Sequence, residues 1–144
     1  MENNDTVYLL KECDSGAKMA ISSIEEILDK TSDSNLQQLL KESKSHHEKL
    51  CDEIHSLLIQ HESGEQKPDP IAKGMSWLKT NVKMSINNSN AAIADLITDG
   101  CNMGIKSLHK YLNQYQAADN ISKDICKRLS SIEEQLCQDL RCYL

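Results

Sequence analysis

The stretch Gly64-Glu65-Gln66-Lys67-Pro68-Asp69-Pro70 decides how this chain can fold. Two prolines and a glycine so close together cannot continue a helix, because proline lacks the backbone N–H and clashes with the preceding turn. On both sides of this break, apolar residues recur at the 3.6-residue period of an amphipathic helix. The chain is therefore expected to form two helical halves joined by a long connection.

Four long helices are predicted, at about residues 5–29, 36–61, 91–115 and 120–143, with residues 62–90 as the crossover between the second and the third. Tight turns join the first helix to the second and the third to the fourth, so each pair should form an antiparallel hairpin. A helix of about 25 residues is about 38 Å long. The long crossover suits a chain that travels this length and sets the third helix parallel to the second. That connectivity is ferritin-like; a simple up-and-down bundle is the alternative.

Local signals support these helices. The polar cluster 31–35 and Ser89 or Asn90 are predicted to cap the helices that follow them, and a short amphipathic helix is expected at Ile71–Ile86 within the crossover. The expected inward-facing residues are Leu10, Ala17, Ile21, Ile24 and Leu28; Leu36, Leu40, Ser43, His47, Leu50, Ile54 and Leu57; Ile93, Leu96, Ile97, Gly100, Gly104, Leu108, Tyr111 and Leu112; and Ile121, Ile125, Leu129, Ile132, Leu136, Leu140 and Tyr143.

The composition favours one all-α domain spanning residues 1–144. The chain is 39% hydrophobic and 26% charged, with no Phe and one Trp, which is typical of a helical-bundle core. The net charge of −6 is spread along the chain, so this acidic protein is not expected to bind nucleic acid. No apolar run is long enough to span a membrane, and the polar residues 1–5 are not a signal peptide. We expect a cytoplasmic protein.

Three stretches resemble a known group of proteins: Lys73-Gly-Met-Ser-Trp-Leu-Lys-Thr-Asn-Val-Lys83, Asp99-Gly-Cys-Asn-Met-Gly104 and Ser107-Leu-His-Lys-Tyr-Leu-Asn-Gln-Tyr115. They are similar to small bacterial ferritin-like four-helix-bundle proteins of unassigned function. The resemblance covers nearly the whole chain, from the Glu12-Cys13 region to Leu144. It implies a ferritin-like fold and supplies no activity.

A di-iron carboxylate centre needs a Glu-x-x-His pair on each of two helices, and this sequence lacks both pairs. Glu42 stands four residues before His46, and the last helix holds Glu133 and Glu134 but no histidine. No cofactor is therefore predicted. A degenerate iron or zinc site is the alternative, since zinc accepts mixed Cys, His and carboxylate ligands. The candidate ligands are Glu12, His46, His47 and Asp99, with Cys13 and Cys101 beside them.

His47 shares a face with Leu40, Leu50 and Ile54, so its ring is expected to point into the bundle. A buried imidazole needs a hydrogen-bond partner, and Asp14 or Asp99 is the expected acceptor. Gly100 and Gly104 each weaken the third helix, which predicts a close contact with another helix or a large side chain at that place. Glu133 and Glu134 are expected on a solvated face.

Six cysteines are spread through the helical patterns without a CxxC motif, which favours free thiols in a reducing compartment. Lys123, Lys127 and Arg128 surround Cys126 and would lower the pKa of an exposed thiol, although a merely solvated helix surface is the plainer interpretation. Cys142 is expected to be the most accessible. The cysteines are Cys13, Cys51, Cys101, Cys126, Cys137 and Cys142.

We find no nucleophile elbow and no glycine-rich phosphate loop, and no catalytic residues are assigned. The first functional hypothesis is a non-catalytic ferritin-like bundle that acts as a structural or interaction protein and self-associates as a homo-oligomer. The second is a metal-binding relative in stress defence. The third is a thiol-based redox or metal-stress module. The protein partner cannot be read from the sequence.

Overall fold

A computed structural model describes residues 4–61 and 89–144 of the chain. These residues form four long helices and a terminal 3₁₀ turn, and none of them is in a strand. The predicted helices are confirmed to within three residues at each end. The short helix expected at Ile71–Ile86 lies outside the described residues. The elements are α1 (Asn4–Leu28), α2 (Ser34–Gln60), α4 (Asn90–Gln114), α5 (Asn120–Leu140) and the 3₁₀ turn η1 (Arg141–Tyr143).

Side-chain caps start three of these helices. The Asp33 carboxylate accepts a hydrogen bond from the Leu36 N–H at 2.9 Å and so caps α2. Ser89 caps α4 in the same way, and Asp119 caps α5 by accepting from Ser122. Each cap satisfies one of the backbone donors that a helix N-terminus leaves without an intrahelical partner. The predicted caps at 31–35 and Ser89 are confirmed.

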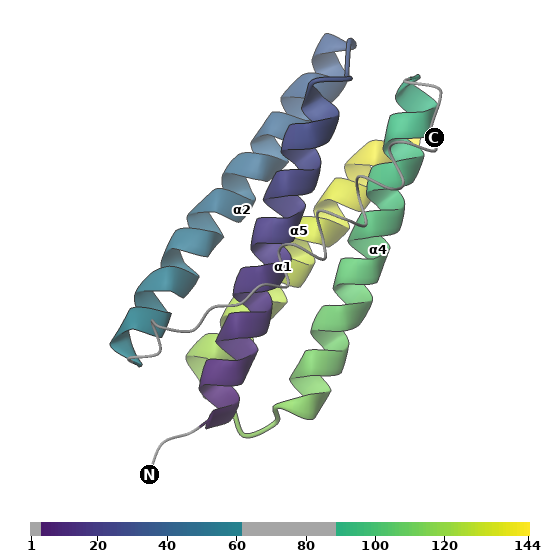
Figure 1. Cartoon of the computed structure of the whole chain (residues 1–144). Helices are drawn as coiled ribbons and strands as arrows, with labels where there is room; N and C mark the ends of the chain where they lie inside the picture. The colour runs from purple at the N-terminus through teal and green to yellow at the C-terminus, as the bar shows by residue number, and fades with distance from the viewer. Residues whose placement is uncertain (1–3, 62–88) are drawn as a thin grey trace.

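The helices α2 and α4 run in the same direction, and α1 and α5 run in the opposite one (Figure 1). The Asn90 amide donates a hydrogen bond to the Asp33 carboxylate at 3.2 Å, which joins the starts of α2 and α4 at one end of the bundle. At the other end, Thr6 at the start of α1 accepts a hydrogen bond from the Asp119 N–H. The parallel arrangement that the connection lengths predicted is therefore present.

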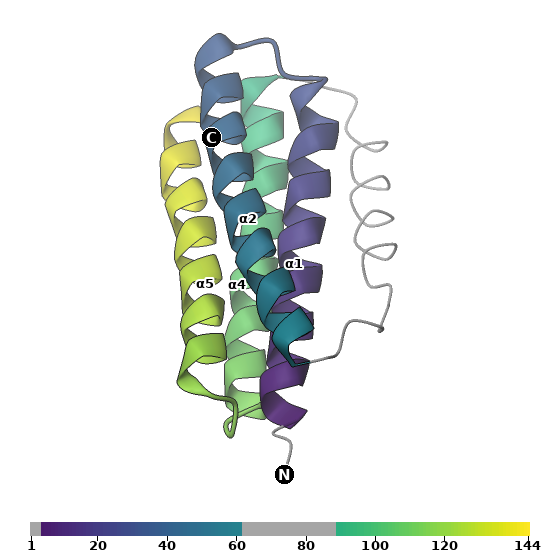
Figure 2. The same ribbon diagram turned by 90° about the vertical axis from the view of Figure 1, so that its left-hand side faces the viewer.

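In the bundle, α1 and α5 lie diagonally opposite each other, as do α2 and α4 (Figure 2). Helix α1 packs against α2, α4 and α5, and α5 also packs against α2 and α4. None of the described helices is long and apolar enough to cross a membrane. The apolar side chains fall into two separate clusters along the bundle axis. One surrounds Leu10, Leu50 and Leu129, and the other surrounds Ile24, Leu40 and Leu136.

A polar layer separates the two apolar clusters. On α2, His47 stands between Leu40 of one cluster and Leu50 of the other, and it is 0% exposed. On α5, Glu133 stands between Leu129 and Leu136 in the same way and is 5% exposed. The fold thus carries these two side chains to one level inside the bundle.

Three positions on α5 differ from the sequence-based expectations. Ile121 was expected to face inward but is 60% exposed, because the capping geometry at Asp119 turns Ser122 into the core instead. Glu133 was expected on a solvated face and is buried. Cys126 was expected on an exposed surface, but it is buried beside Ile125 and its thiol lies 3.6 Å from the Leu108 carbonyl oxygen. The inward face of α5 is therefore rotated toward Ser122, Cys126 and Glu133.

Candidate functional site

The polar layer holds a contact between an imidazole and a carboxyl group. The Nε2 atom of His47 lies 3.5 Å from Oε2 of Glu133, and both side chains are buried. At the other side of the ring, Nδ1 lies 2.8 Å from the backbone carbonyl oxygen of Ser43, one turn earlier on α2. His47 lies within α2 and Glu133 within α5, so the pair is held by packed helices and not by loops.

The contact with Ser43 determines which ring nitrogen carries a proton. A carbonyl oxygen can only accept, so Nδ1–H of His47 donates to it. The Nε2 atom is left facing Glu133 at 3.5 Å, beyond the range of about 2.7–3.2 Å for a hydrogen bond to nitrogen. No described residue completes the hydrogen bonding of this fully buried atom.

Gly104 makes the burial of Glu133 possible. A Cβ atom at position 104 would collide with Oε1 of Glu133 and would lie 3.2 Å from its Cδ. Burial raises the pKa of Glu133, while the contact with His47 opposes this effect. The sequence expectation that a helical glycine marks a close approach is confirmed at Gly104, and the approaching group is the Glu133 carboxyl.

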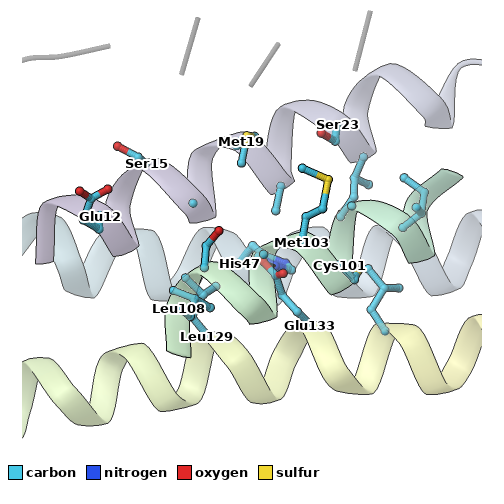
Figure 3. A pocket seen from close by; sticks show the side chains of 18 of the residues that line it. Glu12, Ser15, Met19, Ser23, His47, Cys101, Met103, Leu108, Leu129 and Glu133 are labelled. Carbon is cyan, nitrogen blue, oxygen red and sulfur yellow. Dashed lines mark ion pairs between the residues drawn. The ribbon is translucent and has the colours of Figure 1, made fainter. Parts of the chain in front are cut away.

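Beside this pair lies a cavity of about 330 Å³ between α1 and α4. It exists because small residues stand on the two facing helices and leave space that larger side chains would fill. Figure 3 shows Met19 and Met103 approaching from α1 and α4, with His47 and Glu133 meeting at the base. The small lining residues are Gly16, Ala20 and Ser23 on α1 and Gly100, Gly104 and Ser107 on α4.

The cavity wall is mainly apolar. Ile24, Ile97 and Leu136 line one end, and Leu108 and Leu129 line the other. Met103 lies at the rim and is 52% exposed. Among the described lining residues there is no lysine and no arginine. An apolar wall with a few converging polar groups is the usual construction of a small-molecule site.

A further polar group enters the cavity from α1. Glu12 lines it together with Tyr111 of α4, and burial, together with the neighbouring Glu12, raises the pKa of Tyr111. In Figure 3, Glu12 stands well apart along α1 from the His47–Glu133 pair. The two acidic residues therefore mark different parts of one cavity.

The four sequence-predicted metal candidates do not come together. His47 is buried and Glu12 lines the cavity, but His46 and Asp99 are exposed. Within residues 4–61 and 89–144, no three His, Cys, Asp or Glu side chains gather as a metal site would require. One histidine and one glutamate do not fit the six-residue ligand set of a di-iron centre, so we derive no chemistry through iron.

The prediction that Asp14 or Asp99 accepts a hydrogen bond from His47 was wrong. The exposed Asp99 points away from the core, and Asp14 instead forms an ion pair with Lys18 at 2.9 Å. The partners are the Ser43 carbonyl and Glu133. The place of Glu133 on the face of α5 that carries Leu129 and Leu136, together with the weakened helix at Gly104, was the signal for the second of these, whereas Glu134 lies off that face and is exposed.

The cysteines are all free in the structure. Cys142 is exposed, as expected, whereas Cys13, Cys101 and Cys126 are buried. Burial and the Asp14 carboxylate raise the pKa of Cys51 to about 11, and burial and Glu133 raise the pKa of Cys101. Cys51 and Cys101 therefore lack the electropositive, partly exposed surroundings that activate a cysteine, whereas the neighbouring Cys13 thiol and, after it, Lys127 lower the pKa of the buried Cys126.

Taken together, the site can accept a hydrogen bond at His47 Nε2 and can surround an apolar body with aliphatic side chains. It presents no hydroxyl or thiol hydrogen-bonded to His47, so the described residues form no nucleophile–base pair. Comparison with family models, with curated proteins and with solved structures found no match for this chain.

Proposed function

We propose that this chain is a non-catalytic, ferritin-like four-helix bundle that binds a small, mostly apolar molecule in the cavity between α1 and α4. Two antiparallel hairpins with α2 parallel to α4 support the ferritin-like part of the proposal, since a single long crossover produces that arrangement. The resemblance to small ferritin-like proteins points the same way.

The cavity is the observation that carries the binding function. An apolar cavity of about 150 Å³ is large enough to take benzene, and this one has about 330 Å³. Keeping it costs stability, because Ala20 and Ser23 leave space that a leucine could fill. No described side chain fills this space, and its volume and the buried histidine at its base support the binding of another molecule.

The absence of a nucleophile beside His47 among the described residues supports binding over catalysis. A catalytic histidine needs a hydrogen-bonded hydroxyl, thiol or substrate position opposite a third, orienting group. Here the ring is oriented by a backbone carbonyl and faces a carboxyl group that already touches Gly104. The degenerate metal site would need further ligands beside His47 and Glu133, so it ranks second.

The test is a titration of the full-length protein with p-xylene, followed by two-dimensional NMR. We expect saturable shifts in residues of α1 and α4 that line the cavity. Ala20→Leu fills the cavity and should abolish binding, whereas Ala91→Leu makes the same change at an exposed position of α4 and should leave it intact. Equal binding by both variants, or none by the native protein, would refute the proposal.

A further inference from the structure

We propose that the ligand of this cavity is a neutral apolar molecule with a hydroxyl group, an alcohol or a phenol, which donates a hydrogen bond to Nε2 of His47. The inference rests on the proposed function and specifies the class of molecule bound. It starts from the one fully buried nitrogen that lines the cavity and lacks a hydrogen-bond partner among the described residues.

The protonation of the ring determines what the ligand must offer. Nδ1–H donates to the Ser43 carbonyl at 2.8 Å, so the lone pair of a neutral imidazole lies on Nε2. A charged imidazolium–carboxylate pair would close to about 2.7–2.9 Å, but Nε2 and Glu133 Oε2 lie 3.5 Å apart. Nε2 of His47 is therefore a buried hydrogen-bond acceptor to which a ligand can donate.

Glu133 complements this acceptor. Burial raises the pKa of Glu133, while the contact with His47 opposes this effect, and in its neutral form the carboxyl group can donate a hydrogen bond to the same ligand oxygen. A hydroxyl is the smallest group that both donates to an imidazole nitrogen and accepts from a carboxyl group. Gly104 leaves room for the carboxyl of Glu133, because Oε1 takes the space that a Cβ would need.

The charges around the cavity argue against an ionised ligand. Glu12 disfavours carboxylates and phosphates, and no described lining residue carries a positive charge that would attract them. An ammonium group would have to lose its hydration in a mainly aliphatic wall. The size of the cavity, about 330 Å³, accommodates a substituted ring or a short branched chain.

The experiment compares p-cresol with p-xylene, which differ by a hydroxyl in place of a methyl group, on the full-length native protein. A buried acceptor left without a partner costs about 1–3 kcal/mol, so p-cresol should bind roughly ten- to a hundred-fold tighter. In His47→Leu the ratio should fall to near one while p-xylene still binds. His55→Leu, the same change at an exposed position of α2, should preserve the ratio.

A second measurement does not depend on a variant. The ¹⁵N signal of His47 Nε2 should shift on titration with p-cresol and stay unchanged with p-xylene. Equal affinity of the two molecules for the native protein would overturn the hydroxyl proposal and leave apolar binding standing. Tighter binding of 4-methylbenzylamine than of p-cresol would also overturn it, in favour of a cationic ligand. If no compound binds, the proposed function itself fails.

Discussion

The carboxyl group of Glu133 on α5 lies against the Cα of Gly104 on α4, where a side chain of even one carbon would meet it. Through this contact the two helices place a titratable group between the two apolar clusters of the core, next to His47. A glycine in a helix costs about 1 kcal/mol relative to alanine. The glycine is needed at position 104 despite this cost, because the Cβ of an alanine would displace the carboxyl group of Glu133.

We expect Gly104→Ala to lower the free energy of unfolding by about 1–2 kcal/mol, since the cost of overpacking exceeds the gain in helix propensity. Gly16→Ala is the matched control. A Cβ there meets Leu129 Cδ2 at an ordinary 3.9 Å, so this change should stabilise by about 0.5–1 kcal/mol.

In a Glu133→Ala background, Gly104→Ala should also become stabilising. Urea unfolding of the variants measures these effects, and a destabilising Gly104→Ala in that background would contradict the explanation.

The raised pKa of Glu133 predicts a loss of stability as the pH rises. Its ordinary value is 4.5, and burial raises the pKa in the folded state. Between the two values the folded state binds more protons than the unfolded state, so the free energy of unfolding falls with increasing pH. The stabilisation is complete below about pH 4.5 and is lost as the pH passes the folded-state pKa.

The measurement is urea unfolding between about pH 4 and pH 8. Relative to Glu133→Gln, the native protein should lose stability as the pH rises across this range, because the difference between the two proteins isolates the Glu133 carboxyl, whose pKa burial raises. Glu134→Gln, which alters the exposed neighbour, should track the native protein. A native protein that gains stability over Glu133→Gln with rising pH would show that the carboxyl is stabilised in its charged form.

Thiol accessibility should follow burial. In native protein treated with iodoacetamide at about pH 8, Cys142 should be labelled first, because it is exposed and needs no opening of the bundle. Cys51 should lag because its pKa is raised to about 11. Cys13, Cys101 and Cys126 should react only as the bundle unfolds. Mass spectrometry of peptides gives the order, and rapid labelling of Cys126 in native protein would contradict its burial.

The structural interpretation of His47 predicts that metal is not needed for folding. We expect elemental analysis of protein produced with iron and zinc supplied to show metal far below one equivalent. We also expect His47→Leu to remain folded, at a cost of about 1–3 kcal/mol from the broken polar contact. Near-stoichiometric metal that disappears in His47→Leu would instead make the protein a metalloprotein and displace the proposed apolar ligand.

Local patterns were enough to predict the helices. Neighbouring residues alone give the apolar periodicity, the Asp33 and Ser89 caps and the Gly64–Pro70 break. The lengths of the connections predicted that α2 and α4 run parallel. His47 was correctly placed in the core because its neighbours one and two turns away on α2 are apolar.

The site was harder to predict, because its members depend on other helices. Glu133 stands on the apolar face of α5 between Leu129 and Leu136, but its charge favoured a solvated position, and its burial depends on the room that Gly104 leaves and on His47 facing it. Cys126 has three cations near it in sequence, yet α5 is rotated so that its thiol meets Leu108. The cavity depends on the space that small residues on α1 and α4 leave between them, and no single segment reveals it.

A binding site between α1 and α4 is tested most directly by an intermolecular NOE measurement on native protein with ¹³C-labelled methionine methyl groups and p-xylene. Met19 and Met103 border the cavity from α1 and α4, so a ligand inside it lies near both side chains. We predict NOEs from p-xylene to both, lost in Ala20→Leu and retained in Ala91→Leu. Saturable binding of p-xylene without an NOE to either methionine would place the ligand elsewhere and contradict a binding site between α1 and α4.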